Sequence, residues 1–329
     1  MNSAITGWGM QVPAHILSNA DLERMVDTSD EWIVSRTGIR ERHMTNPDET
    51  ASTLAIGAAR QALTRAGLSA SELDMIIVAT VTGDYTFPAT ACLVQNALGA
   101  SCPSFDIQAA CTGWIYGAVM AHQFIAAGTL RNVLVIGVEV LTKITDFDDR
   151  GTCVLFGDGA GATVFSAHEG TAGILGWTLG ADGARPEQLY RPAGGSRNPL
   201  TRDNMDTHEA YINMMGSEVF KFATRVMGTA MEEAMAKANL TAQDMDLFIP
   251  HQANLRIIEA ASKRLDLPPE KVFVNIERYG NTSAAAIPIA LCEAIEAGRI
   301  HLGSKVGMVA FGAGLTWGAL ALEWATPVE

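Results

Sequence analysis

The sequence ALTRAGLSASELDMII at residues 62–77 aligns without gaps to AMAKANLTAQDMDLFI at residues 234–249. Each copy has the periodicity of an amphipathic helix, followed by a short turn with an aspartate and by the start of an apolar strand. Two further pairs of segments follow in the same order: 124–139 with 294–312, and 155–167 with 310–322. Chance similarity between two helix–strand units is the alternative, but three matches in one order favour an internal duplication.

The duplication predicts two similar halves, residues 1–168 and 169–329. Both halves alternate helical patterns with short apolar runs such as NVLVIGVEV (132–140) and KVGMVAF (305–311), which are typical of strands buried on both faces. We therefore expect a layered α/β fold with internal pseudo-symmetry.

Composition limits the classes of partner. The chain has 329 residues, of which 48% are hydrophobic and 18% charged, so it can bury a large core. Its formal net charge is −13, from 23 basic and 36 acidic residues. This charge argues against general nucleic-acid binding, which needs a basic face. An acidic partner would need a local basic patch.

The sequence also suggests a location. Residues 1–15 lack the basic segment and the long apolar core of a signal peptide. No apolar run is long enough to cross a membrane. Five scattered cysteines without a Cys-x-x-Cys pair fit a reducing compartment better than a disulfide framework. We expect a cytoplasmic protein that is not bound to a membrane.

Three polar residues follow predicted strands. The strand at 103–108 precedes Cys111, the strand at 246–250 precedes His251, and the strand at 271–277 precedes Asn281. Ligands of α/β sheets bind at the carboxyl ends of strands, so we expect these three side chains to converge.

Each of the three residues also has an ordinary structural interpretation. Free cysteines are often small buried core residues, and we assign that role to the other four: Cys92, Cys102, Cys153 and Cys292. Cys111 differs because it stands at the start of a helical pattern, where the helix N-terminus would lower its pKa. His251 could be satisfied by the backbone, and Asn281 could cap the next helix. The combination is more specific than any member.

Six motifs together carry a family resemblance: TSDEWIVSRTGIRERH (28–43), AACTGW (109–114), DRGTCVLFGDGAGA (149–162), PHQANLRI (250–257), YGNTSAA (279–285) and FGAGLTWG (311–318). With them, essentially the whole chain resembles the β-ketoacyl-[acyl-carrier-protein] synthases III, which initiate bacterial fatty acid synthesis. The resemblance implies the thiolase fold, whose two similar halves form five layers, α-β-α-β-α. It places the nucleophilic cysteine in the first half and the histidine and asparagine in the second.

The resemblance also implies a mechanism. Cys111 would attack the thioester of an acyl-CoA and keep the acyl group, and malonyl-[acyl-carrier protein] would then decarboxylate and condense with it. His251 and Asn281 would stabilise the enolate oxygen as neutral donors. The backbone N–H groups of Cys111 and Ala313 would form the oxyanion hole, although many relatives have glycine where this chain has Ala313. No metal or prosthetic group is implied.

A CoA site is expected near the first motif. Thr28 and Glu31 have the spacing of a capping box, and Trp32 and Arg36 lie on one face of the predicted helix. A surface helix with one buried tryptophan is the alternative interpretation. The resemblance implies that the adenine is held by Trp32, Arg36 and Arg150. It implies that the pantetheine tunnel is lined by Thr28, Gly216, Phe220 and Asn254.

A local basic patch lies on the helix predicted from Asn254, where Arg256, Lys263 and Arg264 cluster. In the family this face receives the acidic carrier protein, whereas a solvated charged face is the alternative. Glu259 lies close to the same stripe and weakens the pattern. The family also forms homodimers in which a phenylalanine closes the partner's acyl pocket. Phe87 takes that position here and would favour a short acyl group such as acetyl.

Related enzymes differ at the same positions. A degradative thiolase would have a second cysteine in place of Asn281, and an elongating synthase would have a second histidine. Hydroxymethylglutaryl-CoA synthases use a glutamate base, and plant-type polyketide synthases carry a Gly-Pro-Gly-Gly signature that FGAGLTWG lacks. Two alternatives remain: a specialised initiator that takes an unusual acyl-CoA into a secondary metabolite, and a silent acyl-CoA or carrier-protein binding module. Retention of all three site residues argues against the module.

Overall fold

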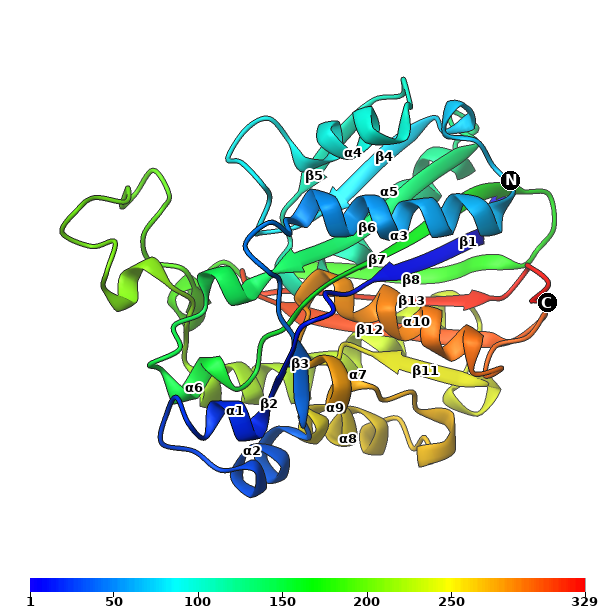
Figure 1. Cartoon of the computed structure of the whole chain (residues 1–329). Coiled ribbons are helices and arrows are strands. Elements are labelled where there is room, and N and C mark those ends of the chain that lie inside the picture. The colour runs from blue at the N-terminus through cyan, green and yellow to red at the C-terminus, as the bar shows by residue number, and fades with distance from the viewer. Residues whose placement is uncertain (329) are drawn as a thin grey trace.

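The structure is a computed structural model that describes residues 1–328. Two β-sheets lie face to face, with helices between them and on both outer faces (Figure 1). The first sheet has five strands, in the spatial order β1 (Asn2–Gln11), β7 (Asp158–His168), β6 (Asn132–Val140), β4 (Met75–Ala79) and β5 (Ser104–Ile107). β4 pairs in parallel with β5 and β6, whereas β7 is antiparallel to both of its neighbours.

The second sheet repeats this arrangement with four strands, in the order β11 (Leu247–Pro250), β12 (Lys305–Gly312), β13 (Thr316–Glu323) and β8 (Gly173–Ala181). β11 and β12 are parallel, and the other pairs are antiparallel. The strand predicted at 271–277 is wrong, since only a parallel bridge between Val272 and Phe248 forms. The backbone N–H groups of Asn275 and Ile276 donate to the side chain of Gln252 instead of continuing a strand.

Helices complete five layers. α3 (Ala51–Ala66) and α4 (Thr90–Leu98) cover the first sheet, and α7 (Gly216–Lys237) and α8 (Leu255–Arg264) cover the second. α5 (Gly113–Ala126) and α10 (Ala286–Glu296) lie between the sheets. Short elements surround one end of the sandwich: β2 (Ile16–Ser18), α1 (Asn19–Leu22), α2 (Asp30–Thr37), β3 (Glu41–His43), α6 (Arg150–Cys153), β9 (Leu189–Tyr190), β10 (Asn213–Met214) and α9 (Ile276–Tyr279). The predicted layered α/β architecture is confirmed.

The two copies of the repeated segment have the same turn chemistry. α3 ends at Gly67, and α7 is followed by Asn239; both residues have left-handed backbones, with φ of 65° and 55°. In the first copy Ser69 and Glu72 form a capping box on a short 3₁₀ turn, and Thr241 and Asp244 do the same in the second. Local signals therefore direct both chains from an outer helix into a parallel strand.

The aspartate of each copy joins its strand to the next parallel strand. Asp74 Oδ2 accepts from the backbone N–H of Asn132 at the start of β6, at 2.9 Å. Asp246 Oδ2 accepts from the N–H of Lys305 at the start of β12, at 2.8 Å. Each carboxylate thereby ties the start of one parallel strand to the start of the next.

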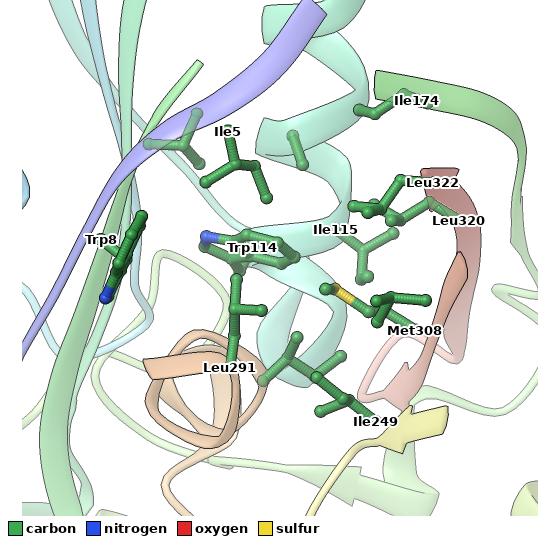
Figure 2. Close-up of a cluster of buried hydrophobic side chains, with 14 of the residues drawn as sticks. Ile5, Trp8, Trp114, Ile115, Ile174, Ile249, Leu291, Met308, Leu320 and Leu322 are labelled. Carbon is green, nitrogen blue, oxygen red and sulfur yellow. The ribbon is translucent and has the colours of Figure 1, made fainter. Parts of the chain in front are cut away.

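The core between the sheets is apolar on every side (Figure 2). Trp114 and Ile115 of α5 point into it together with Leu291 of α10, Ile249 of β11 and Met308 of β12. These side chains are at most 1% exposed. Because α5 begins directly after Cys111, packing of this core fixes the position of the predicted nucleophile.

Arg42 of β3 is fully buried and holds the short elements together. Its guanidinium donates to the backbone oxygen of Leu17 (3.0 Å), to Asn19 Oδ1 (2.9 Å) and to the backbone oxygen of Val154 (2.9 Å). Burial lowers the pKa of Arg42 to about 10, so the group stays protonated near neutral pH.

Replacing Arg42 with methionine should lower the free energy of unfolding by about 3 kcal/mol, because three buried acceptors lose their donor. Urea denaturation measures this change. Arg40→Met is the matched control, since Arg40 is exposed and its replacement should change stability by less than about 0.5 kcal/mol. Equal losses in the two variants would contradict the assigned role.

Candidate active site

Cys111 lies in a 3₁₀ turn, Ala110–Thr112, between the end of β5 and the start of α5. Ala110 has a left-handed backbone with φ of 46°, a strained conformation for alanine. The turn presses against β12, since a Cβ on Gly312 would lie 2.7 Å from the backbone nitrogen of Cys111. Position 312 must therefore be glycine for the thiol to sit at the end of both sheets.

Burial keeps the Cys111 thiol protonated near neutral pH, because it raises the pKa of the thiol to about 12. Hydrogen bonding with Ser283 lowers this pKa, and the nearby Glu139 carboxylate raises it further. The predicted lowering of this pKa by the helix N-terminus is therefore wrong here, because desolvation of the thiolate outweighs it. Attack by this sulfur requires a group that accepts the proton.

His251 follows the end of β11 and is fully buried. Within residues 1–328 neither of its ring nitrogens has a hydrogen-bond partner, which excludes the interpretation as a structural histidine satisfied by the backbone. Its ring packs edge-on against Phe311, with ring centroids 5.6 Å apart. Burial lowers the pKa of His251 to about 3, so the imidazole is neutral and carries one N–H donor.

Asn281 is fixed through its backbone and its side-chain oxygen. Its backbone N–H donates to Leu155 O at 2.8 Å, and its backbone oxygen accepts from Gly157 at 3.1 Å. Its Oδ1 accepts from the N–H of Ser283 at 2.8 Å in a local turn. The alternative role as a helix cap is wrong, because Thr282 and Ala285 are the N-cap residues of the elements that follow. The side-chain oxygen is thereby used, and the amide NH₂ is left as the free donor.

One cavity of about 640 Å³ brings these groups together. Cys111, His251 and Asn281 line it with Phe311, which the sequence analysis did not single out. Five residues predicted to bind CoA line the same cavity: Trp32, Arg36, Gly216, Phe220 and Asn254. The cavity thus joins a cluster of aromatic and basic side chains to a buried thiol with two neutral hydrogen-bond donors.

Comparisons with known proteins give the same family from three directions. A family model described as 3-oxoacyl-[acyl-carrier-protein (ACP)] synthase III matches residues 105–183. A second model, for the C-terminal part of the same family, matches residues 235–324. The β-ketoacyl-[acyl-carrier-protein] synthase III of Symbiobacterium thermophilum is 57% identical over 97% of both chains. This chain belongs to the synthase III family.

Solved structures of family members superpose closely on the fold. The synthase III of Aquifex aeolicus matches with a TM-score of 0.91 and 48% identity, covering 98% of this chain and 100% of that one. The enzyme of Thermus thermophilus matches with a TM-score of 0.92 and 49% identity, covering 98% and 99%. The predicted thiolase fold with five layers is therefore confirmed.

The start of α2 corrects one prediction about the synthase III site. Ser29, not Thr28, caps the helix and accepts from the N–H of Trp32 at 3.1 Å, so the Thr28–Glu31 capping box is wrong. The Thr28 hydroxyl is instead turned inward, and within residues 1–328 it has no partner. Thr28 is also absent from the residues that line the large cavity.

The basic groups near this helix are placed as follows. The guanidinium of Arg150 lies 5.1 Å from the centre of the Trp32 ring and donates to the backbone oxygen of Asp27. Arg36 lines the cavity one turn from Trp32. Asn254 caps α8 by accepting from Arg256 and donates to the backbone oxygen of Arg36, so it joins α8 to α2 at the cavity wall.

A second cavity, of about 170 Å³, opens on the other side of the thiol. Its lining includes Cys111, Ser283, Ala313 and Arg191, and six large apolar residues from separate segments: Val81, Leu141, Ile144, Phe156, Leu189 and Ile212. No sequence motif links these six, and the sequence analysis assigned none of them to the site. Ala313 has no positive φ, so its backbone accommodates alanine where many relatives have glycine.

The predicted basic patch on α8 is only partly free. Arg256 lies over the ring of Phe220, 5.5 Å from its centre, and lines the large cavity. Lys263 is exposed two turns further along α8. Arg264 instead pairs with Glu232 of α7 at 2.9 Å, which neutralises much of its charge. Arg256 and Lys263 are therefore the members available to a partner.

Phe87 lies away from the site of its own chain. Its side chain is 85% exposed, beside Tyr85, which is 63% exposed. Both line a surface hollow that includes Val81, and Val81 also lines the second cavity. A pair of exposed aromatic rings next to the second cavity is typical of a surface that a partner covers.

Proposed function

We propose that this synthase III condenses a short acyl-CoA with malonyl-[acyl-carrier protein], with release of CoA and CO₂, to give 3-oxoacyl-[acyl-carrier protein]. The observation that carries the proposal is the cavity in which the Cys111 thiol meets two neutral donors, His251 and Asn281. The reaction follows a ping-pong order because one thiol must serve both half-reactions. CoA is a substrate here, and the proposal includes no cofactor.

In the first half-reaction Cys111 attacks the acyl thioester. The tetrahedral intermediate places negative charge on the former carbonyl oxygen, which the backbone N–H groups of Cys111 and Ala313 would stabilise. Trp32, Arg36 and Arg150 would hold the adenine and phosphates at the outer end, because indole and guanidinium groups stack on bases and pair with phosphate.

In the second half-reaction malonyl thioester enters the same cavity and loses CO₂. The electron pair moves onto the thioester oxygen, so the transition state gathers negative charge there. His251 is neutral and carries one N–H, and the Asn281 NH₂ is free, so each can donate a hydrogen bond to that oxygen. The resulting enolate carbon attacks the acyl group on Cys111.

The second cavity supports a short acyl primer. Its volume of about 170 Å³ has room for a few carbons in an apolar lining. We further propose a homodimer in which the partner copy's exposed aromatic loop around residue 87 closes this cavity. The exposure of Phe87 supports this arrangement, since a lone chain would leave a large apolar ring in water.

A solved structure represents the specialised-initiator alternative. The priming β-ketosynthase of the R1128 polyketide pathway matches with a TM-score of 0.91 and 34% identity over 99% of this chain. Relatives with 50% identity or more, such as that of Bacillus pumilus at 51%, carry the synthase III name. These identities favour the role in fatty acid synthesis. A silent binding module is disfavoured because all three side chains line the cavity.

The expected cytoplasmic location stays a prediction. In the part of the chain that the structure describes, no helix combines the length and the apolar character that a membrane span requires. All five cysteines are free thiols, which agrees with a reducing compartment.

The proposed function is tested by mixing the protein with acetyl-CoA and malonyl-[acyl-carrier protein] and measuring 3-oxobutyryl-[acyl-carrier protein] by mass spectrometry. Product that depends on both substrates is expected. Condensation only with a longer or unusual acyl-CoA would move the assignment to the specialised initiator. Absence of product with every primer would overturn the proposal.

Changing Arg256 to glutamate should reduce kcat/KM for malonyl-[acyl-carrier protein] by at least about ten-fold. The change replaces a positive charge with a negative one on the surface where the acidic carrier protein is proposed to dock. Acylation by acyl-CoA should fall much less. Lys237→Glu is the matched control, since this lysine lies over Trp177 at the far end of α7. Equal losses with both substrates would refute docking at Arg256.

A further inference from the structure

Glu139 is a fully buried carboxylate behind the active site. It is the penultimate residue of β6, and none of the steps above uses it. Its side chain accepts hydrogen bonds from the hydroxyls of Thr80 and Thr82 and from the backbone N–H of Val81. Its Oε1 also accepts from the hydroxyl of Ser283 at 3.3 Å. A buried acid is costly and is a candidate for function rather than for stability.

Ser283 connects this acid to the nucleophile. Its hydroxyl donates to Glu139 Oε1, and Ser283 and Cys111 line the same second cavity, so the hydroxyl oxygen faces the thiol as a candidate proton acceptor. Its backbone is left-handed, with φ of 48°, and it opens the 3₁₀ turn Ser283–Ala285 as Ala110 opens the turn of Cys111. The two left-handed turns therefore place the thiol and the Ser283 hydroxyl at the same cavity, with the Glu139 carboxylate behind the hydroxyl.

The two other members of the predicted triad are poorly suited to take the thiol proton. His251 is neutral with a strongly lowered pKa, and the free side-chain group of Asn281 is a donor. Burial raises the pKa of Glu139 to about 7, and hydrogen bonds from Thr82, Val81, Ser283 and Thr80 oppose that rise. The titratable group that faces Glu139 is Cys111 itself. A carboxylate with this pKa is ionised above neutral pH and still basic enough to accept a proton.

We propose that Glu139, acting through Ser283, takes the Cys111 proton during acylation, stores it in the acyl-enzyme and returns it during condensation. In acylation the S–H proton moves to Ser283 Oγ, and the hydroxyl proton of Ser283 moves to Glu139 Oε1. The sulfur–acyl bond forms, the bond from the acyl carbon to CoA breaks, and the CoA thiolate takes a proton from solvent. In condensation the carbon–carbon bond forms, the bond to Cys111 breaks, and the relay runs backwards. This inference rests on the proposed function.

Storage of the proton has a chemical benefit. Once Cys111 is acylated, it can no longer donate to Ser283, and an apolar acyl group fills the cavity beside the relay, so both changes favour neutral Glu139. The enolate of the second half-reaction is an anion formed close to this carboxyl group. A neutral Glu139 removes a repulsion that an ionised one would exert from its buried position, where the effective dielectric constant is low.

The first test is proton uptake by the unmodified protein. Acylation by acetyl-CoA without malonyl substrate, in weak buffer with a pH indicator at pH 8, should take up about one proton per acetyl group on Cys111. Glu139→Gln should lose this uptake, because its amide can donate to Ser283 but cannot accept a proton. Uptake of the same size in both proteins would mean that Cys111 is already a thiolate before acylation, and this would overturn the relay.

The second test is the pH dependence of the acylation rate, followed by rapid quench and mass spectrometry. The rate should fall as the pH drops through about 7, where Glu139 becomes protonated. At pH 7.5, Glu139→Gln and Ser283→Ala should acylate about 100-fold more slowly, with acyl-CoA affinity and malonyl decarboxylation little changed. Thr82→Val removes one hydrogen bond from the carboxylate but spares the relay, so it should move the fall in rate to higher pH.

A structural role for Glu139 would not produce that pH shift. If Glu139→Gln does not fold, Thr82→Val and the unmodified protein still decide the outcome. Normal acylation of Cys111 with an unchanged pH profile in Ser283→Ala and Thr82→Val would overturn the relay alone. Absence of any acyl group on Cys111 in the unmodified protein would instead overturn the proposed function.

Discussion

Cys111→Ala should lower the rate of condensation by at least about 1000-fold, because no other group in the cavity can carry the acyl chain. The decarboxylation of malonyl-[acyl-carrier protein] should continue, since the donors for the enolate oxygen, His251 and Asn281, are untouched. Alanine fits the space left by the thiol, so the fold should be retained. This separation of decarboxylation from condensation is the largest effect that the site geometry predicts.

Release of ¹⁴CO₂ from labelled malonyl-[acyl-carrier protein] and formation of the 3-oxoacyl product measure the two activities side by side. Cys92→Ala is the matched control, because Cys92 lies outside the lining of both active-site cavities. The buried core role predicted for Cys92 is wrong, since it is an exposed thiol on α4. The Cys92→Ala variant should keep full activity. Condensation at the normal rate in Cys111→Ala would show that the acyl group is carried elsewhere.

His251→Ala should produce the reverse pattern. Loss of one preorganised donor to a developing oxyanion typically lowers the rate by about 100-fold to 1000-fold. Decarboxylation and condensation should both fall by this factor, whereas acyl transfer from acyl-CoA to Cys111 should stay near its normal rate. The pKa of His251 is lowered to about 3, so the imidazole does not serve as the base for the thiol.

Single-turnover acylation followed by mass spectrometry separates this outcome from a general loss of structure. Asn281→Ala should behave like His251→Ala, because it removes the second donor. If either variant lost acylation and decarboxylation to the same degree, His251 and Asn281 would have to act on the thiol rather than on the enolate.

The duplicated segments carried most of the fold prediction. The turns at Gly67 and Asn239, with their capping boxes and their strand-joining aspartates, are local features that sequence periodicity and turn chemistry reveal. The convergence of Cys111, His251 and Asn281 followed from their places near predicted strand ends. Asn281 reached the site although its strand did not form, because the backbone of Leu155 and Gly157 holds it.

Other features depend on contacts between distant segments. Thr28 and Ser29 are neighbours, and either hydroxyl could have capped α2. The Thr28 hydroxyl is buried, so Ser29 is the capping residue. The raised pKa of Cys111 comes from the depth of the pocket, which the sequence does not display. In the sequence, Glu139 is visible only as one charged residue that interrupts an apolar strand. Its contact with Ser283 links residues 144 positions apart.

The measurement that tests the account most directly is mass spectrometry of the protein after mixing with a panel of acyl-CoAs, without malonyl substrate. The account predicts one acyl group per chain, on the peptide that contains Cys111, with a short acyl group loading best and no loading of Cys111→Ala. No adduct with any acyl-CoA, or an adduct on another residue, would contradict it.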